Sequence, residues 1–144
     1  MAYKTKYTVQ NASKYIGDPT KIICRSLWER RVCRYLDENK KVVQWGSEEL
    51  AIPYHSPVDN KIHRYYPDFI TDIIKEEGAV TTYVIEVKPK KQTRPPQKKK
   101  KKNKTYIQEQ ITYSVNEAKW KSAKTFCEQN GWKFLILTED DILP

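Results

Sequence analysis

The sequence predicts an α/β fold in which a small mixed sheet is flanked by helices. Two amphipathic segments, 26–39 and 114–130, each begin with Ser and carry Glu three residues later, the capping-box pattern of a helix start. Between them, 68–74 and 79–87 are rich in β-branched and aromatic residues and are joined by a charged turn ending in glycine, which predicts an antiparallel hairpin. The apolar run 132–137 follows the second helix and predicts a strand parallel to a hairpin strand.

Residues 1–25 are expected to form an N-terminal arm that packs on the domain. The segment is polar but contains tyrosines, and Gly17-Asp18-Pro19-Thr20 predicts a turn. The domain itself is then expected to span residues 26–144. We expect the arm to be attached through Tyr7, Val9, Tyr15 and Ile16.

The first predicted helix has Ser26 as its N-cap. Glu29, at the capping-box position, has two interpretations: it binds a backbone N–H at the helix start, or it is an acid directed at a catalytic site. The sequence leaves both open. An apolar stripe is predicted at Leu27, Trp28, Val32, Tyr35 and Leu36.

Short extended segments are predicted between this helix and the hairpin. Residues 41–45 predict a strand that breaks at Gly46, and 50–54 resume in extended form. Residues 56–61 form a loop or hairpin connection, and Pro67 then keeps the residue before it out of helical geometry. Three antiparallel strands therefore precede the second helix.

Two acids and a lysine are expected to meet at one end of the hairpin. Antiparallel pairing makes Asp68 and Glu86 neighbours, and Lys88 shares the face of Glu86 because residues i and i+2 of a strand point the same way. Carboxylates bind Mg²⁺, with Mn²⁺ as a substitute, and such a metal supplies an attacking water and neutralises phosphate charge. We expect Asp68, Glu86 and the Val87 carbonyl to hold the metal, Lys88 to hold the phosphate or orient the water, and Glu29 to complete the acidic cluster.

Each part of this pattern is common by itself. Pro-Asp pairs mark turns, and Glu-x-Lys on a strand is often a solvated charge pair. The acids, the lysine and the helix glutamate nevertheless occur in the right order on suitable elements. Their conjunction favours a metal-dependent site for phosphodiester hydrolysis.

Positive charge is concentrated in residues 88–104. This segment holds ten of the 27 Lys and Arg residues and no acid, while the other 17 are balanced by 18 Asp and Glu. Like charges repel, so the segment should be extended, and Pro89, Pro95 and Pro96 oppose regular structure. A solubilising loop is one interpretation, but a start beside the acids favours contact with DNA phosphates. The residues expected at the DNA are Lys90, Lys91, Arg94, Lys98, Lys99, Lys100, Lys101, Lys102 and Lys104. After this segment, 105–113 predicts a short separate helix.

Cysteine and histidine offer little support for other chemistry. Cys24, Cys33 and Cys127 are scattered, so we expect reduced, semi-buried thiols rather than disulfides or a zinc site. His55 and His63 are expected in polar loops.

No apolar run approaches the roughly 20 residues of a membrane span, and the start of the chain lacks a signal-peptide pattern. An intracellular protein, or one packaged from inside a cell, is expected.

Pro67-Asp68 followed by Glu86-Val87-Lys88 resembles the signature of the PD-(D/E)xK nucleases. The order αβββαβ resembles the restriction-endonuclease-like core of that superfamily, and Glu29 matches its frequent first-helix acid. From about Tyr15 onward the chain resembles the head-completion nucleases of tailed phages, which are related to transposon-end-cutting nucleases. The wider resemblance lies in 25–30, 45–48, 52–54, 63–69, 116–120 and 134–139.

The resemblance implies a Mg²⁺-dependent DNA endonuclease that acts on packaged phage DNA ends, in the virion or the host cytoplasm. Capsid or portal proteins are its implied partners. A junction-resolving or repair nuclease with the same site is one alternative, because a site does not encode the shape of its DNA. Another is a structural head or DNA-end protein that binds without cutting. No recognition-helix pattern is evident, so backbone and shape recognition is expected.

Overall fold

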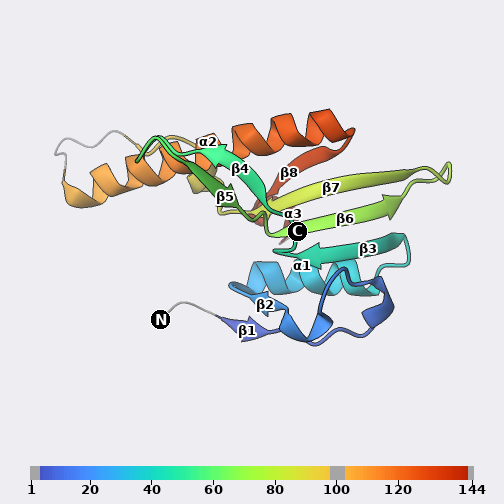
Figure 1. The fold of residues 1–144 in the computed structure, drawn as a ribbon. Coiled ribbons are helices and arrows are strands. Elements are labelled where there is room, and N and C mark those ends of the chain that lie inside the picture. Colours follow the sequence, from blue (N-terminus) through green and yellow to red (C-terminus); the bar gives the residue numbers. More distant parts are fainter. Residues whose placement is uncertain (1–3, 98–102, 143–144) are drawn as a thin grey trace.

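A computed structural model describes residues 4–97 and 103–142 (Figure 1). The central sheet has the strand order β3–β6–β7–β8. Strand β6 pairs antiparallel with β3 and β7, and β8 pairs parallel to β7. The predicted mixed sheet is therefore confirmed. Its strands are β3 (Val42–Ser47), β6 (Phe69–Ile74), β7 (Val80–Val87) and β8 (Lys133–Leu137).

Helices cover both faces of this sheet (Figure 1). Helix α1 (Leu27–Glu38) lies on one face with the ribbon of β1 (Thr5–Lys6) and β2 (Ile23–Cys24). Helix α2 (Lys104–Asn130) lies on the other with the hairpin of β4 (Ile52–His55) and β5 (Ile62–Tyr65). Alternate side chains of β7 pack into the cores on opposite faces of the sheet. Ile85 and Val87 face the α1 side, and Val84 faces the α2 side. The shorter elements are the 3₁₀ turns η1 (Ala12–Lys14), η2 (Pro19–Lys21) and η3 (Lys90–Thr93), and helix α3 (Glu139–Ile142).

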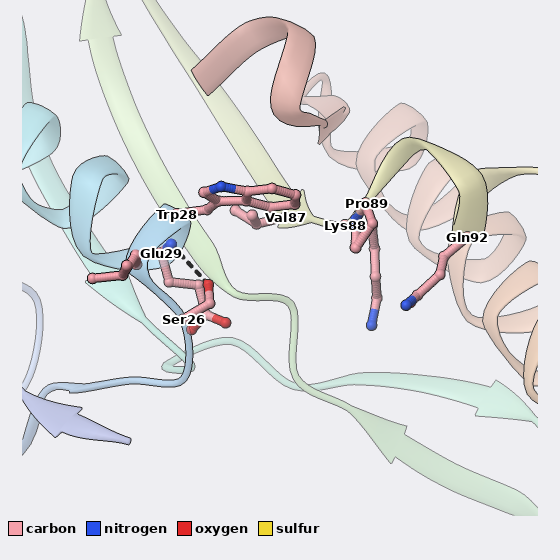
Figure 2. A pocket seen from close by; sticks show the side chains of 8 residues that line it. Ser26, Trp28, Glu29, Val87, Lys88, Pro89 and Gln92 are labelled. Atoms are coloured by element: carbon pink, nitrogen blue, oxygen red, sulfur yellow. Dashed lines mark hydrogen bonds between the residues drawn. The ribbon is translucent and has the colours of Figure 1, made fainter. Parts of the chain in front are cut away.

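Helix α1 begins where predicted but buries a different face. The Ser26 Oγ accepts a hydrogen bond from the Glu29 N–H at 3.0 Å, which confirms the N-cap (Figure 2). Two residues of the predicted stripe point outward instead: Leu27 is 62% exposed and Tyr35 is 54% exposed. The stripe prediction was wrong for these two because the N-terminal arm covers an adjacent strip of the helix. The buried residues of α1 are Val32, Cys33, Leu36 and Asp37.

The arm is held by a buried carboxylate. Asp37 is fully buried and accepts hydrogen bonds from the Tyr7 hydroxyl (2.8 Å) and from the N–H groups of Gln10 (2.7 Å) and Asn11 (3.0 Å). Burial and the neighbouring Asp37 carboxylate raise the pKa of Tyr7 far above its ordinary value. Tyr7 and Tyr15 are both buried against Trp45 in the α1-side core. A side chain in α1 therefore organises a segment about thirty residues earlier in the chain.

The two helices predicted on either side of Ser114 are one helix. Asn103 is the N-cap of α2, and its side chain accepts a hydrogen bond from the Tyr106 N–H at 2.8 Å. No Pro or Gly interrupts residues 104–130, so the helix continues through the second capping sequence. The predicted end is confirmed, because Gly131 adopts the left-handed backbone conformation with φ 71°.

Smaller predictions were also corrected. Strand β3 continues through Gly46 to Ser47, because it pairs with β6 as far as Phe69. His55 and His63 lie on strands β4 and β5 rather than in loops. The segment after β7 is not wholly irregular, since the turn η3 forms directly after Pro89.

The three thiols are free and fully buried rather than semi-buried. Cys24 and Cys33 lie side by side, with 3.4 Å between their sulfur atoms. Among the described residues, the helices are too short or too polar to cross a lipid bilayer.

Candidate active site

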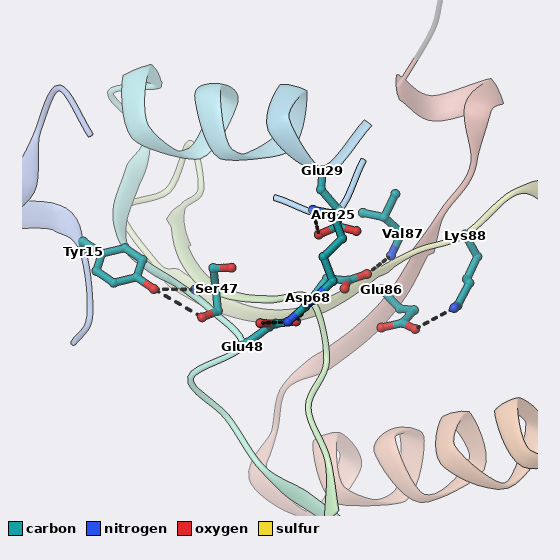
Figure 3. A network of polar contacts seen from close by, with 9 residues as sticks. All are labelled: Tyr15, Arg25, Glu29, Ser47, Glu48, Asp68, Glu86, Val87 and Lys88. Carbon is teal, nitrogen blue, oxygen red and sulfur yellow. Dashed lines mark hydrogen bonds and ion pairs between the residues drawn. The ribbon is translucent and has the colours of Figure 1, made fainter. Parts of the chain in front are cut away.

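Asp68 and Glu86 lie together at one end of the β6–β7 pair (Figure 3). Phe69 pairs with Ile85, so the same register places Asp68, directly before β6, opposite Glu86. The Asp68 Oδ2 accepts a hydrogen bond from the Val87 N–H at 2.7 Å, and Glu86 is only 6% exposed. The structure therefore brings the two carboxylates together, as antiparallel pairing requires.

Lys88 lies beside them at the point where the chain leaves β7. Its Nζ is 3.8 Å from the Glu86 Oε2, and its side chain is 28% exposed. Its N–H donates to the Leu137 carbonyl at 3.0 Å, which ties this position to β8. The ammonium group thus has access to solvent while its backbone is fixed by the sheet.

Glu29 reaches the same region from the start of α1. Its Oε1 accepts a hydrogen bond from the Arg25 N–H at 3.2 Å, one residue before the position expected for a capping box. Burial raises the pKa of the Glu29 carboxyl, and the charges of Glu48 and Glu86 raise it further. Both interpretations of Glu29 are compatible with this geometry, because it caps the helix and also faces the acidic cluster.

The three acids place more negative charge in one region than their neighbours neutralise. Burial, followed by the charges of Glu86 and Glu29, raises the pKa of Asp68 to about 8. The Val87 N–H and the Lys88 ammonium oppose this rise only in part. A cation bound among these carboxylates would lower their mutual repulsion.

Comparison with known proteins identifies the family of this chain. The model of the TnsA-like endonuclease N-terminal domain matches residues 39–139. The chain belongs to the TnsA-like endonucleases. It is also 42% identical to the head completion nuclease of Enterobacteria phage T4, over 99% of this chain and 95% of that protein. The expected enzyme class, a DNA endonuclease, is confirmed.

In this TnsA-like endonuclease the matched region contains Asp68, Glu86 and Lys88. Helix α1 and Glu29 lie before the matched residues, although the similarity to the T4 protein covers them. The α/β fold, with a mixed sheet between helices, is consistent with this family.

Sequence reasoning did not single out an ion pair at the mouth of the site. Arg25 binds Glu48 through Nε–Oε1 (3.0 Å) and Nη2–Oε2 (3.4 Å), as Figure 3 shows. Glu48 has a left-handed backbone conformation, φ 54°, which is uncommon for a non-glycine residue. Its N–H donates to the Asp68 carbonyl at 3.1 Å, so this conformation connects the end of β3 to the start of β6. The only sequence signal was that both residues fall within segments resembling the phage nucleases.

Two further polar side chains near the acids were not singled out as site residues, although both lie in segments that resemble the phage nucleases. The buried Tyr65 hydroxyl lies close to Glu86 and to Trp120, whose Nε1 is also buried. Burial raises the pKa of Tyr65, and the carboxylates of Glu86 and Asp68 raise it further. Tyr65 therefore borders Glu86 from the α2 side of the sheet.

The basic residues after β7 differ in how they are held. The Lys90 Nζ binds the Asp140 Oδ2 at 2.8 Å, and the Lys90 backbone N–H donates to the Glu139 Oε1 at 2.6 Å. Both contacts hold Lys90 against acidic residues of α3. Lys91 and Arg94 are exposed around η3. Lys104 is exposed at the first position of α2, and Lys98, Lys99, Lys100, Lys101 and Lys102 lie outside the described residues.

Proposed function

We propose that this endonuclease hydrolyses DNA phosphodiester bonds with Mg²⁺ and acts on packaged DNA ends in the completion of a tailed-phage head. The observation that carries the chemical proposal is the pairing of Asp68 with Glu86 beside Lys88 at the sheet end. The head-completion role rests on the 42% identity to the phage T4 protein of that name. A location in the virion or the host cytoplasm follows from that role, and capsid or portal proteins are the proposed partners.

The residues present fit a hard divalent cation. Within residues 4–97 and 103–142, no three Asp, Glu, His or Cys side chains are grouped closely enough to hold a metal ion by themselves. Mg²⁺ does not need such a group, because it keeps several waters and is often held by one or two carboxylates. Asp68 and Glu86, with the Val87 carbonyl, would hold it, and Mn²⁺ has the same ligand preference. When bound, the ion would activate a water and neutralise phosphate charge.

The protein's own groups then have separate tasks. The Val87 N–H orients the Asp68 carboxylate through its hydrogen bond of 2.7 Å. Lys88, which is partly exposed, binds the non-bridging oxygens of the phosphate or orients the attacking water. Glu29 adds negative charge from α1 and strengthens the attraction for a cation.

Plasmid nicking tests the proposal directly. Wild-type protein should nick supercoiled DNA with Mg²⁺ and lose this activity in excess chelator. Glu86→Gln should lower the rate at least about 100-fold, because it removes a charged metal ligand. Glu77→Gln, in the exposed turn between β6 and β7, is the matched control and should keep wild-type activity. Nicking that is unaffected by chelator, or equal in the Glu86 variant, would refute the metal mechanism.

The exposed basic residues should bind DNA through its phosphates. Changing Lys91 and Arg94 together to Gln should reduce the slope of log affinity against log salt by about 1.8, since each phosphate contact contributes about 0.9. Neutralising Lys98 to Lys102 should reduce it further. The charge-matched control changes Lys40 and Lys41 to Gln. These residues lie directly before β3, whose first residue pairs with Ile73 at the end of β6 away from Asp68. Equal slopes for both double variants would exclude η3 from the interface.

A further inference from the structure

A cavity of about 450 Å³ opens directly beside the acidic site. Figure 2 shows its walls: the Trp28 indole lies over Val87, and Pro89 and Gln92 form the opposite side. Its volume falls within the range of pockets that hold small organic ligands. Trp28 is also partly buried against the α1-side core, so its position is fixed by packing.

The cavity and the acidic site share residues. Glu29, Val87 and Lys88 line the cavity and also form part of the acidic cluster or its border. A group that enters the cavity therefore lies next to any ligand bound at Lys88. If a DNA phosphate lies at Lys88, as the proposed function requires, the group within reach is the base of an adjoining nucleotide.

The cavity walls suit the chemistry of a nucleobase. Leu27, Trp28 and Pro89 provide apolar surface, and Leu27 is 62% exposed because no part of the described chain covers it. Aromatic side chains stack on bases of any sequence. The Gln92 amide, which points towards the cavity in Figure 2, offers both a donor and an acceptor to a base edge.

We propose that this cavity binds one unstacked nucleobase next to the scissile phosphate, and that the endonuclease therefore prefers DNA with an unpaired nucleotide at the cut. This proposal rests on the proposed function. Extruding a base from a duplex costs free energy, and the cost is least where the base is already unpaired. Frayed ends, flaps and gaps are thus the expected substrates, and continuous duplex is the poorer one.

Cleavage of matched oligonucleotides with Mg²⁺ tests the preference. Wild type should cut a flapped duplex roughly tenfold faster than the same sequence fully paired, as expected for one stacked base. Replacing the unpaired nucleotide with an abasic site should remove this advantage. Trp28→Leu, which keeps apolar volume without a flat ring, should also remove it, whereas Trp28→Phe should retain most of it. Tyr35→Ala, an exposed aromatic of α1 away from the cavity, should leave it unchanged.

A binding measurement separates this proposal from the proposed function. With Glu86→Gln protein, 2-aminopurine at the unpaired position should lose fluorescence on binding, and Trp28→Leu in the same background should abolish that loss. Equal cleavage of flapped, abasic and paired DNA by an active wild type, or unchanged 2-aminopurine fluorescence, would overturn the base pocket. Absence of Mg²⁺-dependent cleavage on every substrate would overturn the proposed function instead, while the fluorescence result would still decide the pocket.

Discussion

Asp68→Asn should abolish DNA nicking while making the metal-free protein more resistant to heat. The rate should fall at least about 1,000-fold, since loss of a charged metal ligand removes several kcal/mol of transition-state stabilisation. The Asn oxygen can still accept the Val87 N–H, but the repulsion with Glu86 and Glu29 disappears. We expect the melting temperature in chelator to rise by about 3 °C or more near pH 8.

The sign of the pH dependence follows from the raised pKa. The pKa of Asp68 is about 8 in the folded protein and roughly 3.9 in an unfolded chain. Between these values the folded state binds more protons, so the stability of the metal-free protein falls as pH rises through this window. The advantage of Asp68→Asn should therefore be small near pH 4 and largest above pH 8. Glu77→Gln is the control, and a variant less stable than wild type at pH 8 would contradict the crowding of the acids.

Asp37→Ala should cause the largest loss of stability, about 3 kcal/mol or more. The change removes the acceptor for the Tyr7 hydroxyl and for the N–H groups of Gln10 and Asn11. Urea unfolding measures this loss directly. Glu38→Ala, the next residue, is the matched control: its exposed pair with Arg34 at 3.5 Å should contribute less than about 0.5 kcal/mol. Similar losses for the two variants would show that Asp37 does not anchor the arm.

The active-site pair could be predicted because it depends on local pattern. Alternation and turn chemistry give the register of one hairpin, and that register alone makes Asp68 and Glu86 neighbours. The parallel pairing of β8 could also be predicted, since a strand that follows a helical crossover has few possible positions in the sheet. These parts of the fold are set by residues close in the sequence or by general rules of chain connection.

The remaining features depend on contacts between distant segments. The buried face of α1 could not be predicted because Asp37 is covered by Tyr7, thirty residues earlier in the arm, and a carboxylate gives no apolar signal. The sequence from Ser114 to Glu117 has the pattern of a helix start, but the residues before it are helical too, so no helix ends there. The Arg25–Glu48 pair joins positions 23 residues apart on unrelated elements, so no spacing rule connects them.

The shortness of the connection between β6 and β7 has a consequence for the order of folding. The turn closes with the Lys75 N–H bonded to the Ala79 carbonyl at 2.7 Å, and Gly78 takes the required positive φ of 84°. Contacts of such low sequence separation form early, before a parallel partner such as β8 can return through α2. We therefore expect Asp68 and Glu86 to meet early in folding. A divalent cation that binds this pair should therefore speed folding much more than it slows unfolding, which refolding kinetics with and without Mg²⁺ would measure.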